Sequence, residues 1–374
     1  MYAVARSRPG EWSMHWTSAG GVGVIWWGGS EKRTRQVIHV PVVAVEVIEH
    51  VYIERRCPLR GHRNVPKVEL GEQVVGKNRL SSSTMAMIAS LHEVGRLPLE
   101  QIQWLLSSFH KLKLSVGEIV RVLHIVAGKA AGTKARLREE LRSSPVVHAD
   151  ETGWRQDGQN GYLWSFSGEQ VHYVAAEASR ASEVVRRVLG EDFRGVLVSD
   201  FYSAYNFLDC PHQRCWVHLL RDVHELTERH PQDKGVAQWA EAVHELYLEA
   251  KATSQRDKDL PREERAAARQ GLEERLLGLA TPYLKADVPQ RVLCQRIDRF
   301  LAELLTFVEL PMVPSDNNAA ERAIRPQVVA RKISGGTRSP KGSATKATLA
   351  TLFSTWHLRG LNTFLTCREF LNSP

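Results

Sequence analysis

The sequence predicts an α/β fold in which a mixed sheet is flanked by helices, and two observations support this prediction. Residues 145–208 contain stretches in which apolar and polar side chains alternate, which is typical of strands. The segments on either side repeat apolar side chains every three to four residues, which is typical of amphipathic helices. A chain of 374 residues with 43% hydrophobic side chains is long enough to bury such a core.

Composition and charge narrow the class of protein. The 50 Lys and Arg residues exceed the 42 Asp and Glu residues, and the net charge of +8 suits a polyanion such as DNA. Five scattered cysteines, an odd number, indicate a reducing compartment rather than a disulfide framework. The chain shows no signal-peptide core, and its apolar runs are shorter than the roughly 18 residues that a membrane span needs. We therefore expect a soluble, cytoplasmic protein without a membrane partner.

The amino-terminal third divides into three predicted regions. Residues 1–36 are rich in Gly, Ser and Trp without a sustained period, and we expect them to be atypical or disordered. Residues 37–53 alternate Val and Ile with polar residues, which predicts a strand or hairpin within a region that extends to residue 80. Residues 81–140 contain three amphipathic segments, which could form a helix-turn-helix unit or an all-helical packing unit. Ser115 and Glu118 form a capping-box pattern at the start of the third segment.

The catalytic region is predicted to span residues 141–374. "PVVHADETGW" reads as a strand ending in acids, and "GYLWSFSG" and "QVHYVAAE" read as a hairpin. "SRASEVVRRVLG" predicts a helix, and "RGVLVSDFYSAY" predicts a fourth strand that also ends in an acid. A right-handed crossover lays this fourth strand parallel to the first.

The remainder of the chain is predicted to be helical. Residues from about 222 to 310 form a helical insertion that interrupts the α/β pattern. A short helix follows in "SDNNAAERAIRP", where Asp316 can cap the start and Pro326 is expected to mark the end. The basic, Gly-rich stretch "RKISGGTRSPKGSATK" is predicted to be a loop before the last long helix.

Three acidic residues form the candidate catalytic set. Asp150 and Asp200 each follow an apolar strand, so parallel pairing places them at the same edge of the sheet. Carboxylates that lie so close repel each other unless they share cations or a proton. Glu321 can supply a third carboxylate, and three carboxylates suit two divalent ions that promote phosphodiester cleavage. Glu151 and Asp316 are alternative ligands that spacing does not exclude.

Basic and amide side chains surround these acids. The glycine-rich stretch lacks the spacing of a nucleotide-binding P-loop, so its cations are expected to contact DNA phosphates, the alternative being a solvated loop. Cys215 and His218 have a zinc-like spacing, but no second pair completes a zinc site and no zinc is expected. The residues expected to contact DNA are His218, Asn318, Arg322, Arg325, Arg331, Lys332, Arg338 and Lys341.

Several motifs together resemble a known family. "HADETGW", "VLVSDFYSAYN", "CWVHLLRD" and "SDNNAAERAIRP" followed by "RKISGG" are similar to successive blocks of the insertion-sequence-66 family of bacterial transposases. The resemblance spans roughly Leu80 to Leu371. It implies a ribonuclease H-like fold, with a helical insertion between the second Asp and the Glu of a metal-binding triad. Matched block by block, the triad falls on Asp150, Asp200 and Glu321.

The resemblance also implies cofactors, partners and activity. It implies two Mg²⁺ or Mn²⁺ ions, double-stranded DNA as substrate and target, a homo-oligomer on DNA, and possible accessory proteins of the same element. The family's zinc ribbon is expected to be degenerate, because Cys57 lacks a partner and Arg60 stands where a second cysteine belongs. The expected function is DNA cleavage and joining by a transposase. The alternatives are a ribonuclease H-like nuclease without joining activity and a catalytically degenerate DNA-binding remnant.

Overall fold

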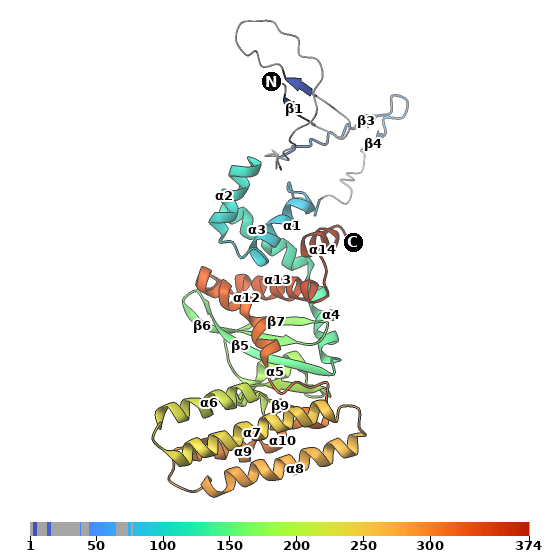
Figure 1. Ribbon diagram of the computed structural model, residues 1–374. Coiled ribbons are helices and arrows are strands. Elements are labelled where there is room, and N and C mark those ends of the chain that lie inside the picture. Colours follow the sequence, from blue (N-terminus) through green and yellow to red (C-terminus); the bar gives the residue numbers. More distant parts are fainter. Residues whose placement is uncertain are drawn as a thin grey trace, which may run out of the picture. The chain divides into compact units, whose positions relative to one another are not determined.

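The computed structural model describes most of the chain from residue 45 onward (Figure 1). The described residues are 3–5, 13–15, 38, 45–64, 74–75 and 78–373. The chain divides into two compact units, Met1–Val43 and Ala44–Pro374. In the first unit, β1 (Ala3–Ala5) pairs with β2 (Ser13–His15) in antiparallel fashion. The rest of residues 1–36, which we predicted to be atypical or disordered, lies outside the described residues.

The strand predicted over residues 37–53 is absent where the structure describes this segment. Residues 45–54 form no strand, and residues 37 and 39–44 lie outside the described part. Val47 and Val51 are 90% and 73% exposed, so the alternating pattern has no buried face to stabilise a strand. The only pairing within residues 45–64 joins β3 (Arg55–Arg56) to β4 (Arg63–Asn64).

A five-stranded mixed sheet forms the centre of the second unit. Its strands are β5 (Val146–Gln156), β6 (Gln159–Ser167), β7 (His172–Glu177), β8 (Val196–Ser199) and β9 (His212–Arg214). The spatial order is β7-β6-β5-β8-β9, with an antiparallel meander on one side and parallel pairing of β5, β8 and β9 on the other. This arrangement confirms the ribonuclease H-like α/β fold and the predicted parallel neighbours. The three-residue strand β9 was not predicted.

Strand β5 is longer than its sequence pattern indicates. The prediction ended this strand at its acids, but β5 continues to Gln156. It continues because β6 pairs with β5 from His148 to the last residue of the strand, Gln156. In contrast, β8 pairs with β5 only from Val146 to His148. Asp150 therefore lies within a strand rather than at its end.

One face of the sheet is covered by helices that precede and follow the meander. These are α4 (Ala131–Arg142), which precedes the meander, and α5 (Ser182–Leu189), which connects β7 to β8. The earlier helices are α1 (Ser82–Glu93), α2 (Leu99–His110) and α3 (Val116–Lys129), and of these α1 and α3 contact the carboxyl-terminal helices. Val147 and Ala149 of β5 belong to the same buried cluster as Leu141 of α4 and Val184 of α5. Ser115 and Glu118 form the predicted capping box of α3. A DNA-binding role for α1–α3 stays a prediction.

The opposite face carries the helices that follow the insertion. These are α12 (Asn318–Ser334) and α13 (Pro340–Leu358), followed by α14 (Thr363–Asn372), and α12 and α13 cross the meander in Figure 1. Trp154, Leu163 and Val174 from the three meander strands pack against Ala347 and Ala350 of α13. This layer brings the carboxyl-terminal part of the chain over β5.

Helix α12 extends beyond its predicted end. Pro326 was expected to stop the helix but lies inside it, and the predicted basic loop shrinks to residues 335–339. Proline removes one helical hydrogen bond and normally breaks a helix. Here Ala320, Ile324 and Gln327 are all buried on the face that meets the sheet, and this packing offsets the loss.

The helical insertion lies between β9 and α12. It consists of α6 (Trp216–Arg229), α7 (Lys234–Arg256), α8 (Arg262–Ala280), α9 (Arg291–Arg299), α10 (Leu301–Leu304) and α11 (Thr306–Glu309). Residues 216–309, all described, contain no strand, so the predicted insertion is confirmed and begins slightly earlier. Trp216, predicted to be core, is fully buried in a cluster that includes Val196 and Val198 of β8. None of the described helices is long and apolar enough to cross a membrane.

A buried ion pair joins the amino-terminal helices to α13. The ammonium of Lys346 donates a 2.8 Å hydrogen bond to Glu93, and both side chains are less than 10% exposed. Burial by itself raises the pKa of the Glu93 carboxyl. The charge of Lys346 and the contact with His92 outweigh this effect, so the pKa falls from 4.5 to about 2.

We predict that Lys346→Met lowers the free energy of unfolding by about 3 kcal/mol at neutral pH, because it leaves a buried carboxylate without its main cation. The depressed pKa of Glu93 stabilises the folded state above pH 4.5, and this contribution is lost as the pH falls toward 2. The variant should therefore lose less stability over that acidic window. Urea unfolding across this pH range measures both effects.

Arg275→Met provides the control, because it breaks an ion pair with Glu249 in which both side chains are about half exposed. Such a pair contributes at most about 1 kcal/mol. Equal losses for the two variants would contradict the buried-pair interpretation.

Candidate active site

Two aspartates occupy matching positions on neighbouring parallel strands. The β5–β8 register pairs His148 with Val198, and Asp150 and Asp200 each lie two residues further along. Since side chains two residues apart point to the same face of a strand, Asp150 is set on the face that carries α12. Asp200 directly follows the last residue of β8, at the matching position beside it. The register thus agrees with the adjacency predicted from the sequence.

The carboxyl group of Asp150 experiences the charges of the neighbouring acids. Its Oδ1 accepts a 2.8 Å hydrogen bond from the backbone N–H of Glu151. The pKa of Asp150 rises to about 7, because burial and the negative charges of Glu151, Asp200 and Glu321 together outweigh the lowering by that hydrogen bond. A carboxyl group whose pKa is raised by neighbouring carboxylates attracts a cation or retains a proton.

The backbone of Asp200 is held by a buried arginine that the sequence analysis did not identify. Arg214 of β9 is fully buried and donates a 2.7 Å hydrogen bond to the backbone carbonyl of Asp200. The same guanidinium donates to Asn206 at 2.7 Å and to Glu303 of the insertion at 2.5 Å. Oδ1 of Asp200 accepts the backbone N–H of Tyr202 at 2.9 Å. A buried charge with this many acceptors fixes the chain at the end of β8.

Asn317 anchors the start of α12 on the sheet. Its side chain is buried, and its Nδ2 donates a 2.8 Å hydrogen bond to the carbonyl of Ala149. Its Oδ1 lies 3.1 Å from Nδ1 of His148, and its backbone N–H donates to Sγ of Cys215 at 3.2 Å. Helix α12 therefore begins directly above the strand residue that precedes Asp150, and Glu321 follows one turn later.

The side chain of Glu321 lies next to α6, the first helix of the insertion. Its Oε1 lies 3.9 Å from Nε2 of His218 in α6, while the Nδ1 of His218 is buried without a hydrogen-bond partner. In the described part of the chain, no three His, Cys, Asp or Glu side chains are gathered closely enough to hold a metal ion. The triad itself therefore stays a proposal.

The two alternative ligands already have hydrogen-bond partners. Both carboxylate oxygens of Glu151 accept hydrogen bonds, one from Arg180 and the other from the hydroxyl of Tyr205 at 2.6 Å. The side chain of Glu151 is only 3% exposed. Oδ1 of Asp316 accepts the backbone N–H of Asn318 at 3.0 Å, so it closes a turn at the start of α12. Neither acid is as free as Glu321, whose side chain is 40% exposed.

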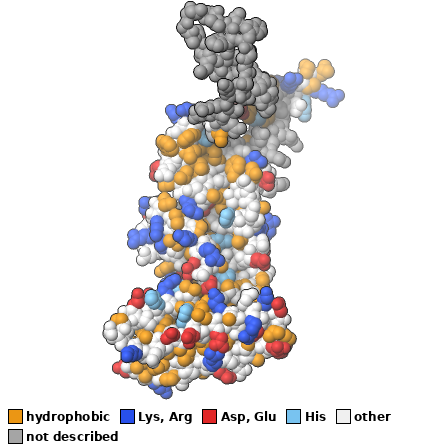
Figure 2. All heavy atoms as spheres, viewed as in Figure 1, with side chains coloured by type: hydrophobic (Ala, Val, Ile, Leu, Met, Phe, Trp, Pro, Cys, Tyr) orange, Lys and Arg blue, Asp and Glu red, His pale blue; other side chains and the backbone are white. Residues whose placement is uncertain are grey.

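Exposed cations extend along the helices that carry Glu321. Figure 2 shows Lys and Arg side chains gathered over the middle of the face on which α12 lies in Figure 1. The exposed members of the predicted set are Arg322, Arg325, Lys332, Arg338 and Lys341. Ion pairs within the described residues involve none of these five. Arg331 differs, because it donates 2.9 Å hydrogen bonds to Thr152 and to the carbonyl of Gly153 and so fastens α12 to β5.

The paired glycines between α12 and α13 have a structural explanation. Gly335 ends α12 with a φ of +69°, a conformation that favours glycine. A Cβ atom on Gly336 would lie 2.1 Å from the carbonyl oxygen of Arg155, so only glycine fits against β5 there. Thr337 donates to the same carbonyl at 2.9 Å. These contacts belong to packing and need no bound phosphate.

Comparison with known proteins identifies the family. The model of the family described as "Transposase IS66 family" matches residues 77–345, which is more than half of the chain. Two relatives come from Sinorhizobium fredii (strain NBRC 101917 / NGR234). "Uncharacterized protein y4jO" is 33% identical over 45% of this chain and 49% of its own length. "Uncharacterized protein y4qI" is 28% identical over 60% of this chain and 47% of its own length. The chain spans about half the length of the curated relatives it matches.

We predict that Asn317→Ala lowers the free energy of unfolding by about 2 kcal/mol, because it leaves the buried carbonyl of Ala149 without its donor. Urea unfolding followed by tryptophan fluorescence measures the change. Asn160→Ala serves as the control, since this amide is exposed at the end of β6 and its loss should cost less than about 0.5 kcal/mol. If Asn317→Ala costs no more than this control, the anchor has been assigned to the wrong residue.

Proposed function

Because the chain belongs to the IS66 family of transposases, we propose that it cleaves DNA at the ends of a mobile element and joins those ends to new DNA. One observation carries the proposal: Asp150 and Asp200 occupy matching positions on parallel strands, and Glu321 lies within electrostatic reach of Asp150. In this proposal the three side chains are the catalytic carboxylates. A water molecule attacks the phosphodiester and breaks its bond to the 3′ oxygen, which leaves a 5′-phosphate and a free 3′-hydroxyl. This hydroxyl then attacks a phosphodiester of the target, forming a new P–O bond while the bond to the target's own 3′ oxygen breaks and that oxygen leaves as a 3′-hydroxyl.

The chemistry of the three side chains fits two hard divalent cations, Mg²⁺ or Mn²⁺. All three proposed ligands are carboxylates, the donors that such ions prefer. The half-exposed side chain of Glu321 has room to turn toward the aspartates, whose backbones are fixed by the sheet and by Arg214. When bound, the ions supply an activated attacking oxygen and stabilise the charge that develops on the phosphate. His218 would orient Glu321 from the insertion side.

The same helix offers a surface for the DNA backbone. Asn318 lies in the first turn of α12, where the helix dipole favours anions, and Arg322 and Arg325 follow in the second turn. The exposed cations Lys332, Arg338 and Lys341 continue this surface to the start of α13. We propose that these side chains hold phosphates beside the carboxylates. We also propose that the chain acts on DNA as a homo-oligomer, together with accessory proteins of the same element.

We predict that Asp150→Asn reduces metal-dependent nicking of supercoiled plasmid by more than about a hundredfold, because it removes a metal ligand. Duplex affinity should stay the same or rise, since the change also removes a negative charge. Chelation by EDTA should abolish wild-type nicking, and Mg²⁺ or Mn²⁺ in excess should restore it.

Asp298→Asn is the matched control, because Asp298 is an exposed aspartate in α9 of the insertion. Its nicking rate should equal that of the wild type. Normal nicking by Asp150→Asn would refute the assignment of the triad. Nicking without joining of paired element ends would favour the nuclease alternative.

We predict that Arg338→Ala and Lys341→Ala together weaken binding to random-sequence duplex and flatten its salt dependence. Each phosphate contact contributes roughly 0.9 to the slope of log affinity against log salt concentration, so losing two should flatten it by about 2. Fluorescence anisotropy from low to moderate salt measures the slope.

The control is Lys258→Ala with Lys285→Ala, which removes the same charge from exposed positions of the insertion. This pair should leave the slope nearly unchanged. An unaltered slope in the folded Arg338/Lys341 double variant would remove the α12–α13 turn from the DNA path.

A further inference from the structure

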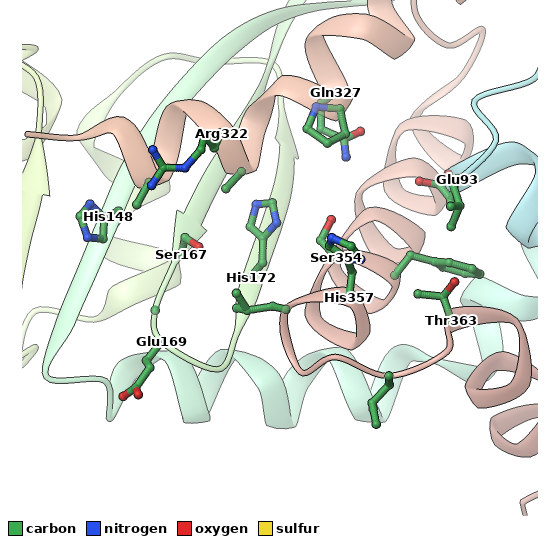
Figure 3. A pocket seen from close by; sticks show the side chains of 18 of the residues that line it. Glu93, His148, Ser167, Glu169, His172, Arg322, Gln327, Ser354, His357 and Thr363 are labelled. Carbon is green, nitrogen blue, oxygen red and sulfur yellow. The ribbon is translucent and has the colours of Figure 1, made fainter.

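A large cavity lies beneath α12, next to the proposed catalytic residues. Its volume is about 1100 Å³, and its walls come from α12, the start of β5, the β6–β7 turn and the ends of α13 and α1. Figure 3 shows Arg322 and His148 at one end of the cavity and Glu93 at the other. Arg322 directly follows Glu321 in α12, and His148 lies two positions before Asp150 on the same face of β5. The cavity therefore ends at residues that are close in sequence to Asp150 and Glu321.

One face of α12 forms the roof of the cavity. The residues that α12 contributes are Ala319, Arg322, Ala323, Pro326 and Gln327. Their spacing of three and four residues places them on one side of the helix. The exposed guanidinium of Arg322 thus marks the end nearest the proposed DNA surface, while the small side chain of Ala323 leaves space below the helix.

A buried polar atom in this roof lacks a partner. Gln327 is only 2% exposed, it lines the cavity, and its Oε1 has no hydrogen-bond partner within the described part of the chain. Burying an amide oxygen without a partner costs roughly 1–3 kcal/mol, and a rotation of this side chain that turns the oxygen into the cavity lets a ligand or water satisfy it. In Figure 3 the amide lies above His172 and Ser354.

The remaining walls combine apolar and polar surfaces. Phe353 and Leu358 of α13 supply apolar surface, and His148 and Ser167 supply polar groups. Ligand cavities typically enclose roughly 300–1,000 Å³, so this cavity has room for a nucleotide. A single bound water would satisfy Gln327 but would not account for the size of the cavity or for its apolar wall.

We propose that this cavity binds one unpaired nucleotide of the DNA substrate, a proposal that rests on the proposed function. The amide of Gln327 can hydrogen-bond to the edge of a base, and the apolar wall can contact its face. Arg322 at the entrance holds the adjoining phosphate. A base that is still paired in a duplex cannot enter, so the nucleotide is one that has left the helix at or near the cleaved end.

The test compares two probes with the full-length chain. One is a blunt duplex, and the other is the same duplex with a single unpaired 3′ nucleotide, each of the four bases in turn. Stacking and hydrogen bonding of one base contribute roughly 1–3 kcal/mol. The wild type should therefore bind the overhang probe at least about fivefold more tightly than the blunt probe, as measured by fluorescence anisotropy.

Two variants locate this preference in the cavity. Gln327→Leu keeps the size of the side chain but removes the amide, and it should reduce the preference by about three- to tenfold. Ala323→Trp fills the space beneath α12 and should abolish the preference. Gln290→Leu is the matched control, because Gln290 is also buried with an unpartnered Oε1 but lies at the start of α9 in the insertion. It should keep the full preference.

The outcomes separate this inference from the proposed function. A wild-type chain that binds blunt duplex and nicks plasmid, but shows no preference for the overhang, would overturn the cavity assignment alone. An unchanged preference in both folded variants would overturn it as well. Failure to bind blunt duplex and to nick plasmid would overturn the proposed function and this inference together.

Discussion

The attachment of α12 to β5 is the constraint on which the candidate active site depends. Asn317 holds the start of the helix to the carbonyl of Ala149, and Arg331 holds its last turns to Thr152 and Gly153. Because both ends are fastened to one strand, the helix crosses the face that carries Asp150. Glu321 lies between the two attachments, and its backbone position is therefore set even though its side chain is partly exposed.

The second aspartate depends on a different part of the molecule. Asp200 follows the short strand β8, whose Val196 and Val198 pack into the core of the helical insertion. Arg214 connects the backbone of Asp200 to Glu303 in that insertion through a fully buried guanidinium. The insertion therefore supports the sheet edge at which β8 ends. The candidate site lies where the meander, the insertion and α12 meet. The meander carries Asp150, α12 carries Glu321, and the insertion holds the backbone of Asp200 through Arg214.

Negative and positive side chains lie close together around this site. Acidic side chains lie against the sheet, where burial and mutual repulsion raise the pKa of Asp150. The cations Arg322 and Arg325 lie exposed on α12 immediately beside them. In the proposed function, a phosphodiester drawn to these cations is brought next to carboxylates that have few partners other than backbone N–H groups. Partly buried acids thus lie beside exposed bases, an arrangement that suits the proposed anionic substrate and cationic cofactors.

The sequence by itself determined the meander, the parallel β8, the helical insertion and the matching positions of Asp150 and Asp200 along neighbouring strands, because these depend on local periodicity and strand order. Tertiary packing decided the rest. The valines of residues 45–53 alternate as in a strand, yet their side chains pack against no buried surface. Pro326 does not end α12, because the buried side of this helix offsets the hydrogen bond that proline removes. The positioning roles of Asn317 and Arg214 were also invisible in the sequence. The role of a buried amide or guanidinium depends on the backbone carbonyls to which it donates hydrogen bonds after packing. These carbonyls lie up to 168 positions away along the chain.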